Sequence, residues 1–359
     1  MLNLAIIGPG LVGSEFIAQI TRAKLSFVRI VAISNSRHML LNAHGLSPAS
    51  WTSDLAASST QADLAELARH TASTAAATPG SRSVIVDCTS SEHVAQRYPE
   101  WLDQGLSIVT PNKKAFSGEA ALWKDIFGAA KRSKSLVLHE STVGAGLPIL
   151  STLKDLVETG DSISRIEGIF SGTLSYLFNN FSSPSPAAAS ASFSSIVTKA
   201  KSLGYTEPDP RDDLNGMDVA RKVVILARVA GLELDLNTLE VQNIVPKELQ
   251  TAASADEFMA ALPSADKHFD ALNEEAWKEG CVLRYVGCVD PVNGCSVKLA
   301  KYPLSHPFAA LTGSDNIVAF TTSYFPSPLI IQGAGAGAAV TSFGMFSDLL
   351  KISRVHGLC

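Results

Sequence analysis

The chain has 359 residues, of which 46% are hydrophobic and 18% charged, so it can form two globular domains with large cores. Its net charge of −5 and the lack of a basic stripe argue against nucleic acid or an anionic membrane as partner. The long uncharged stretches 168–198 and 316–347 are broken by Pro, Ser, Asn or Gly and predict no membrane span. The chain opens on MLNLAIIGPG, without the pattern of a secretory signal, so we expect a cytoplasmic protein.

The cysteines indicate neither a disulfide framework nor a zinc site. They are odd in number and none stands in a CxxC spacing, so we expect free thiols in a reducing compartment. The cysteines are Cys88, Cys281, Cys288, Cys295 and Cys359.

A glycine-rich turn follows the first predicted strand. Residues 4–7 form a short apolar run, and a helical apolar pattern begins after GPGLVG, a GxGxxG motif in strand-to-helix context. The first glycine allows the turn, the second admits a pyrophosphate, and the third lets helix and strand pack closely. A tight turn without nucleotide is the alternative, and Pro9 removes one backbone donor. The predicted cofactor contacts here are Gly8, Gly10, Leu11, Val12 and Gly13.

The second predicted strand, residues 29–33, ends in Ser34-Asn35-Ser36-Arg37 without an acidic residue. An NAD-specific site usually places Asp or Glu there to bind the ribose 2′-hydroxyl. Arg37 suits a 2′-phosphate instead, so NADP(H) is the favoured cofactor and NAD(H) remains open. A solvated loop arginine is the alternative. Residues 53–80, rich in Ala, Ser and Thr, predict a helix with a variable loop.

Three further strands alternate with helices, which predicts an α/β, Rossmann-type doubly wound parallel sheet. The strands are expected at 84–87, 107–110 and 136–138, with helices at 93–103 and 119–131.

Polar residues stand where these strands end, which is where a parallel sheet of this type binds its ligand. Thr89 and Ser90 are candidate contacts for the nicotinamide ribose, and Lys113 or Lys114 for cofactor or substrate. Capped loops are the alternative for each of these strand ends.

The remainder of the chain predicts a second domain of α+β type. The segment 182–193, SSPSPAAASASF, predicts an exposed flexible loop, and Asn293-Gly294 predicts a hairpin turn. Edge strands from 281–332 could pair across a two-fold axis. Strands are expected at 164–171, 281–290, 295–302, 316–324 and 329–332, helices within 236–279, and a second glycine-rich helix entry at 333–337.

The segment 205–231 combines an acidic, proline-stiffened loop with an apolar helix of about four turns. Asp212 or Asp213 can cap its first turn and Gly231 can end it. Asp218 and Lys222 are four residues apart and therefore share one helix face. A partly exposed i, i+4 pair is the alternative to a catalytic pair there.

Seven motifs together resemble the homoserine dehydrogenase family, in its short fungal type. They are GPGLVG, TPNKKAF, HESTVGAGLP, GIFSGTLSY, LGYTEPDPRDDLNGMDVARK, SHPFAALTGSDN and IQGAGAGAAVT. The resemblance covers nearly the whole chain. It implies NAD(P)-dependent, reversible reduction of L-aspartate 4-semialdehyde to L-homoserine, toward threonine, methionine and isoleucine, by a homodimer. The expected organisation is a nucleotide-binding domain at 1–147, a catalytic and dimerisation domain at 148–325, and a segment at 326–359 that returns to the first domain.

The resemblance also implies roles for single residues. Lys222 matches the catalytic lysine, Asp218 the carboxylate beside it, and Glu207 the glutamate that holds the substrate's amino group. Lys114 matches a lysine near nicotinamide and substrate, and Gly337 a cofactor contact. The remaining substrate contacts are Gly172, Thr173, Tyr205 and Asp213. A structural monovalent cation, sodium, is implied at Glu140 with the carbonyls of Val143, Ala145 and Leu147.

Two other functions compete with this one. An aldehyde dehydrogenase that acylates a cysteine would need a thiolate at the strand ends, where only Cys88 stands. A catalytically inactive NAD(P)-sensing protein would need the glycine turn but not the set Glu207, Asp218 and Lys222. His306, in SHPF, could titrate near the pocket, although a structural histidine is the simpler interpretation.

Overall fold

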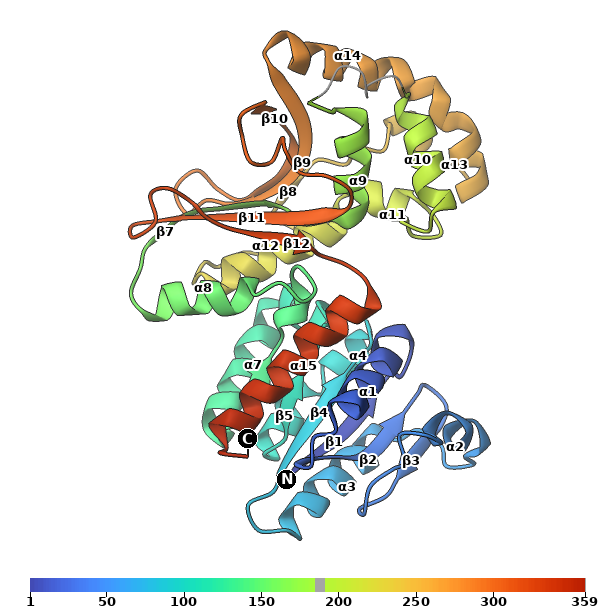
Figure 1. Cartoon of the computed structure of the whole chain (residues 1–359), viewed down its shortest axis with the longest axis vertical. Helices are drawn as coiled ribbons and strands as arrows, with labels where there is room; N and C mark the ends of the chain where they lie inside the picture. Colours follow the sequence, from blue (N-terminus) through green and yellow to red (C-terminus); the bar gives the residue numbers. More distant parts are fainter. Residues whose placement is uncertain (185–190, 359) are drawn as a thin grey trace. The chain divides into compact units, whose positions relative to one another are not determined.

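The computed structural model describes residues 1–184 and 191–358, which form two compact units (Figure 1). The first comprises Met1–Pro148 and Ala336–Cys359, and the second Ile149–Gly335. Among the described residues, no helix has both the length and the apolar character needed to cross a membrane.

The first unit is built on a six-stranded sheet of order β3-β2-β1-β4-β5-β6. All neighbours are parallel except β3, which adds antiparallel to β2 at the edge. The strands are β1 (Leu2–Ile7), β2 (Val28–Ser34), β3 (Met39–Leu41), β4 (Arg82–Asp87), β5 (Ser107–Val109) and β6 (Val137–Leu138). The predicted doubly wound parallel sheet is confirmed. The short β3 gave no alternation long enough to be recognised.

The helices of the first unit cover both faces of this sheet (Figure 1). They are α1 (Leu11–Ala23), α2 (Trp51–Ala57), α3 (Leu64–Ala76), α4 (Glu92–Ala95), α5 (Tyr98–Asp103), α6 (Lys114–Ser117), α7 (Ala120–Ser133) and α15 (Ala338–Val355). Met345, Leu349 and Ile352 of α15 are fully buried in one core with Leu4 and Phe16. The helix α15, near the end of the chain, is therefore part of the core of the first unit.

The second unit has a largely antiparallel sheet of order β12-β11-β7-β9-β10-β8. Its strands are β7 (Ile163–Ile169), β8 (Glu240–Val241), β9 (Cys281–Val289), β10 (Ser296–Pro303), β11 (Asp315–Thr322) and β12 (Leu329–Ala334). The β9–β10 hairpin confirms the turn at Asn293-Gly294, where Gly294 has φ +93°. Because β12 pairs with β11, the segment expected to return from residue 326 still belongs to the second unit up to Gly335.

The helices of the second unit are α8 (Ile149–Glu158), α9 (Gly172–Phe181), α10 (Phe193–Ser202), α11 (Arg211–Leu214), α12 (Met217–Val229), α13 (Ala255–Ala261) and α14 (Asp266–Lys278). The helical prediction for 236–279 was too broad, because β8 and a 3₁₀ turn at Lys247–Leu249 precede α13. The prediction of an exposed loop at 182–193 was wrong at its ends, where Ser182, Ser183 and Phe193 are buried. Its central residues, 185–190, lie outside the described part.

The predicted single helix after the acidic loop is two helices, α11 and α12. Gly216 separates them with φ +77°, and a Cβ there would lie 2.0 Å from the Tyr285 hydroxyl. Asp212 and Asp213 therefore belong to α11 and do not cap α12. Gly231 has φ +86° just after α12, as predicted. The break leaves Asp218 in the first turn of α12.

Candidate active site

The glycine turn of the first unit has the geometry of a phosphate-binding turn. Gly8 has φ +76°, and a Cβ on Gly13 would lie 2.7 Å from the Gly8 carbonyl oxygen, so these two glycines serve conformation and packing. A Cβ on Gly10, in contrast, would meet nothing within 4 Å. No side chain caps the N-terminus of α1, and its first turn holds no acidic residue. The helix end is thus open to an anion.

The side chain of Asp87, at the end of β4, organises the neighbouring strand ends. Its carboxylate accepts hydrogen bonds from the Thr89 amide N–H (2.8 Å), the Asn112 side-chain amide (3.0 Å) and the Tyr98 hydroxyl. Asp87 is fully buried, and burial raises the pKa of its carboxyl group despite these donors. Asp87 thereby fixes the loops that carry Thr89, which is half-buried, and the exposed Ser90.

The lysine loop after β5 is fixed by Asn112. The Asn112 side-chain oxygen accepts from the Lys114 backbone N–H at 3.1 Å, and Lys114 then begins α6. Lys113 and Lys114 are both half-buried. The backbone of Lys114, one of the two lysines predicted as contacts, is therefore held by the side chain of a neighbouring asparagine.

Cys88 has the environment of a structural thiol. Burial and the nearby Asp87 carboxylate raise its pKa well above the usual range. A Cβ on Gly13 would lie 3.3 Å from the Cys88 Sγ, so this thiol packs against the glycine turn. A thiol that resists ionisation is a poor nucleophile, which argues against the acylating alternative.

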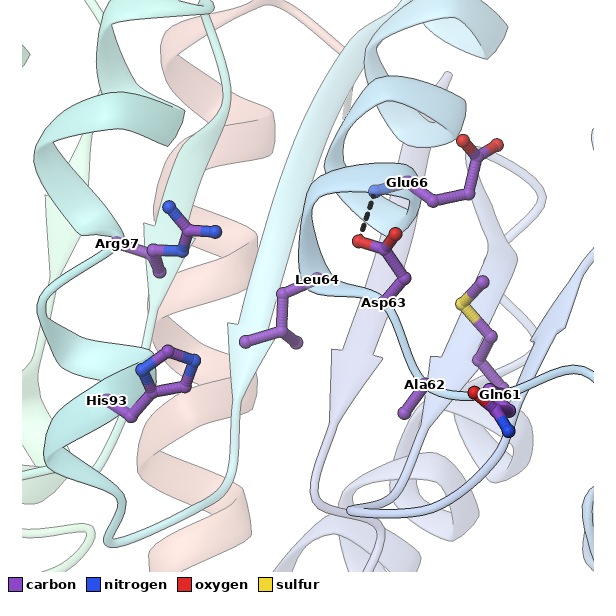
Figure 2. A pocket seen from close by; sticks show the side chains of 8 residues that line it. Gln61, Ala62, Asp63, Leu64, Glu66, His93 and Arg97 are labelled. Atoms are coloured by element: carbon purple, nitrogen blue, oxygen red, sulfur yellow. Dashed lines mark hydrogen bonds between the residues drawn. The ribbon is translucent and has the colours of Figure 1, made fainter.

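A pocket of about 570 Å³ lies between the start of α3 and α4 in the first unit. In Figure 2, His93 and Arg97 face Leu64 and Asp63 across it. Asp63 caps α3 by accepting from the Ala65 and Glu66 amides. The exposed Arg37 adjoins this wall, because its carbonyl oxygen accepts from the Ala62 amide at 2.9 Å. The lining residues are Met39, Gln61, Ala62, Asp63, Leu64, Glu66, His93 and Arg97.

The loop between β6 and α8 contains the residues expected at a monovalent cation. Glu140 is buried, and its carboxylate lies 3.2 Å from the Lys351 ammonium of α15. Gly144 and Ala145 both have positive φ, +72° and +53°, which is unusual for an alanine. Val143 and Ala145 are buried. Within the described residues, no group of three or more His, Cys, Asp or Glu side chains could hold a metal ion.

Lys222 is the central charged group of the second unit. Its Nζ lies 2.7 Å from Asp218 Oδ2 and donates to the Phe170 carbonyl oxygen at 2.7 Å. The Lys222 side chain is 10% exposed, whereas that of Asp218 is 48% exposed. The i, i+4 spacing predicted the pair, and the structure confirms the contact. It is a buried ammonium held by a solvated carboxylate.

The predicted substrate residues of the second unit lie together at the start of α9 and in the acidic loop. Thr173 Oγ1 donates to the Tyr205 carbonyl oxygen (2.6 Å), and the Glu207 amide donates to Asp213 Oδ2 (2.8 Å). Burial raises the pKa of Asp213, with further contributions from the charges of Glu207 and Asp218. Gly172 opens α9 beside Thr173. Glu207 and Asp213 are therefore two neighbouring carboxylates whose charges affect each other, an arrangement suited to an ammonium group.

His306 has the contacts expected of a structural residue of the second unit. Its Nδ1 accepts from the Phe308 amide at 3.2 Å, and its ring contacts those of Tyr302 and Phe308. Burial lowers its pKa, which favours the neutral ring at ordinary pH.

Three residues of these clusters were not singled out from the sequence. Asp87 and Lys351 carry no motif. The Asn316 side-chain amide donates to the Phe170 carbonyl oxygen at 3.0 Å, the same oxygen that Lys222 contacts. Asn316 stands in SHPFAALTGSDN, but nothing in that motif indicated this contact. Gly337, predicted as a cofactor contact, precedes α15 with φ +106° and open space around the position of a Cβ.

A glycine turn on a parallel sheet, with a separate α+β unit that buries a lysine, defines a two-domain nicotinamide-dependent oxidoreductase. Two protein-family models match the chain, "Homoserine dehydrogenase" over residues 148–350 and "Homoserine dehydrogenase, NAD binding domain" over residues 8–140. The chain belongs to the homoserine dehydrogenase family, whose enzymes serve amino-acid biosynthesis.

Curated relatives agree with this assignment. The chain is 45% identical to a homoserine dehydrogenase of Saccharomyces cerevisiae, over 99% of this chain and 98% of that protein. It is 48% identical to one of Emericella nidulans, over 98% of each. A bifunctional aspartokinase/homoserine dehydrogenase of Arabidopsis thaliana is 48% identical, but the chain spans only 39% of its length.

Solved structures share the fold. A Candida auris protein of unknown function superposes with a TM-score of 0.92 at 45% identity, covering 98% of both chains. A hyperthermophilic archaeal homoserine dehydrogenase in complex with NADPH superposes with a TM-score of 0.74 at 22% identity, covering 99% of this chain and 98% of that one.

Proposed function

We propose that the protein catalyses the reversible, NAD(P)-dependent reduction of L-aspartate 4-semialdehyde to L-homoserine, in the route to threonine, methionine and isoleucine. The observation that carries this proposal is the buried ammonium of Lys222, paired with Asp218 in a chain of this family. A sensor protein has no need to bury a charge on an otherwise apolar helix face, and such burial is costly.

Lys222 is the proposed proton donor. When bound, the reduced nicotinamide supplies the hydride for the aldehyde carbon. The oxygen then needs a proton as it becomes an alkoxide, and the Lys222 ammonium gives one. Asp218 and the Phe170 carbonyl hold that ammonium from two directions, at 2.7 Å each. In the reverse direction, neutral Lys222 accepts the proton of the homoserine hydroxyl.

Glu207 and Asp213 are proposed to bind the amino group of the substrate. Glu207 lies on the acidic loop and Asp213 on α11, and the Glu207 amide donates to the Asp213 carboxylate. An incoming ammonium would stabilise the ionised form of Asp213, whose pKa is raised without it. Thr173, Gly172 and Tyr205 are proposed to shape this pocket. Lys114 is proposed to contact substrate and nicotinamide.

NADP(H) is the proposed preferred cofactor. The pyrophosphate would lie on the open turn of Gly8, Gly10 and Gly13 and the uncapped start of α1. Arg97 lines the pocket in Figure 2 together with the carboxylates of Asp63 and Glu66. The backbone of Arg37 adjoins this pocket through its bond to Ala62, and the exposed Arg37 guanidinium is the proposed partner of a 2′-phosphate. Leu11, Val12, Thr89, Ser90 and Gly337 are the other proposed contacts.

Three finer properties are also proposed. A sodium ion is proposed at Glu140 with the carbonyls of Val143, Ala145 and Leu147, on the loop where Gly144 and Ala145 have positive φ and Lys351 already pairs with the Glu140 carboxylate. A homodimer through the second unit is proposed from the exposed edge of its sheet. A cytoplasmic location is proposed because the cysteines among the described residues are free thiols.

A spectrophotometric assay of the purified protein tests the central proposal. We expect homoserine-dependent reduction of NADP⁺ and aspartate-semialdehyde-dependent oxidation of NADPH, with a higher kcat/KM for the phosphorylated cofactor. Arg37→Ala should reduce that preference, while Arg22→Ala on the exposed face of α1 should not. Folded protein that binds NADPH but turns over neither substrate would support a cofactor sensor instead.

A further inference from the structure

The carbonyl oxygen of Phe170 receives two side-chain donors. Lys222 Nζ donates to it at 2.7 Å, and the Asn316 side-chain amide donates at 3.0 Å. A backbone carbonyl has two lone pairs, so one oxygen can accept both bonds. Phe170 follows directly after β7 and precedes the Ser171 cap of α9, whereas Asn316 lies on the neighbouring strand β11.

Asn316 is held in this position by close packing. Its side chain has no solvent exposure, and a Cβ on Gly335 would lie 2.1 Å from its amide nitrogen. The other side-chain atom, Oδ1, is buried and has no hydrogen-bond partner among the described residues. Leaving a buried amide oxygen unpaired costs free energy, so a hydrophobic residue of similar size would suit the fold better. The retained donor is aimed at Phe170 alone.

The ring of Phe170 is fixed as well. A Cβ on Gly168 or Gly287 would come within 3.1 Å of the Phe170 ring, so these two glycines on β7 and β9 leave room for it. With the ring packed and one lone pair bound to Asn316, the carbonyl can present only its second lone pair to Lys222.

We propose that Asn316 is a positioning residue for the proton donor: by binding the Phe170 carbonyl, it directs that oxygen at the Lys222 ammonium. This inference rests on the proposed role of Lys222. The carbonyl dipole favours the charged form of the lysine and sets its direction. Asp218 on α12 itself lies against this ammonium. The charge of Asp218 also acts on Asp213 of α11, as does that of Glu207 on the preceding loop.

Two substitutions at Asn316 should move the alkaline limb of the pH profile in opposite directions. In Asn316→Leu the Phe170 carbonyl keeps its bond to Lys222 but loses the donor that fixes its direction, so the ammonium has a less well-placed acceptor. The alkaline limb of kcat for aldehyde reduction should move down by at most about one pH unit, the shift that full loss of one hydrogen bond to a charged group would produce. In Asn316→Asp a carboxylate stands near the ammonium on the alkaline side, so the same limb should move up.

The experiment measures kcat and KM for aspartate semialdehyde between pH 6 and 10, with NADPH affinity and melting temperature, on the full-length variants. We expect about a tenfold lower kcat for Asn316→Leu at the optimum, with NADPH binding unchanged. Asn273→Leu is the matched control, because the Asn273 amide also donates to a phenylalanine carbonyl, that of Phe181, at 3.2 Å. It should leave the pH profile in place.

The outcomes separate this inference from the proposed function. If Asn316→Leu does not fold, the upward shift in Asn316→Asp decides the matter. Folded Asn316 variants that keep the wild-type alkaline limb would overturn the positioning role. Wild-type turnover in Lys222→Met would overturn the proposed donor, and the role of Asn316 with it.

Discussion

Two helices of this protein carry a lysine paired with a carboxylate one turn earlier, and the two pairs are buried in opposite ways. On α12 the Lys222 side chain is 10% exposed and its partner Asp218 is 48% exposed. On α15 the Lys351 side chain is 35% exposed, whereas its partners Asp348 and Glu140 are 2% and 5% exposed. The buried member is the cation in one cluster and the carboxylates in the other.

This difference in burial points to different roles for the two lysines. Lys351 lies 2.9 Å from Asp348 and 3.2 Å from Glu140, and the Asp348 carboxylate also accepts the Glu140 amide at 2.9 Å. Two buried carboxylates need a counter-charge, and Lys351 provides it. Asp218 needs no such help, because it remains in contact with water. The need of a buried carboxylate for a counter-charge therefore does not explain the burial of Lys222, which is consistent with the proposed proton transfer.

The largest effect is expected from Lys222→Met. Turnover in both directions should fall about 10³-fold, since the proposed proton donor is lost. Melting temperature and NADPH affinity should change little, because Asp218 stays solvated when its partner is removed. Steady-state kinetics, fluorescence titration and thermal unfolding measure the three properties. A large fall in melting temperature with modest loss of turnover would make Lys222 a structural residue like Lys351.

Lys351→Met should give the reverse result. Unfolding free energy should fall by about 2 kcal/mol, less than the loss expected for a wholly buried pair because Lys351 is partly solvated. Turnover should stay close to wild type. Denaturant titration measures the loss, and Arg132→Met is the control. Arg132 pairs with Asp103 at 2.9 Å, but both side chains are exposed, so little stability should be lost. Equal losses of unfolding free energy in Lys351→Met and Arg132→Met would mean that the Lys351 cluster stabilises the fold no more than an exposed ion pair does.

A smaller effect is expected from pH. Burial lowers the pKa of Lys351. The carboxylates of Asp348 and Glu140 together raise it by more than burial lowers it, so the pKa lies above its usual value of 10.5. A lysine whose folded pKa is raised contributes stability that is complete below its unfolded pKa and is lost as pH rises through the folded value. The difference in melting temperature between wild type and Lys351→Met should therefore be constant at pH 7 to 9 and shrink above 10.5. A difference that already vanishes by pH 8 would contradict the ion pair.

Local sequence patterns sufficed for much of the fold and for the charged residues. Apolar runs bounded by glycine or polar residues predicted β1, β4 and the β9–β10 hairpin, because each signal lies within a few residues. Spacing alone predicted the contact of Asp218 with Lys222. The acidic loop was misjudged at Asn215-Gly216, where the side chain of Tyr285 on a distant strand requires a left-handed glycine.

The missing parts of the site depend on backbone atoms and distant residues. The Phe170 carbonyl oxygen accepts a hydrogen bond from Lys222. Every residue has a backbone carbonyl, so the residue type does not indicate which carbonyl takes part in a site. Asn316 reaches it across 146 positions of sequence, through the pairing of β11 with β7. Lys351 reaches Glu140 across 211 positions. Such contacts follow from strand order and helix packing, which the residues in one window do not specify.

The most direct test of Lys222 as the proton donor is the pH dependence of a single turnover of aldehyde reduction, followed by NADPH absorbance in a stopped-flow instrument with excess enzyme. For the wild type we predict a rate constant that falls on the alkaline side as one group loses its proton. For Lys222→Met we predict a slow rate that is flat over the same range. An alkaline limb at the wild-type position in Lys222→Met would mean that another group supplies the proton.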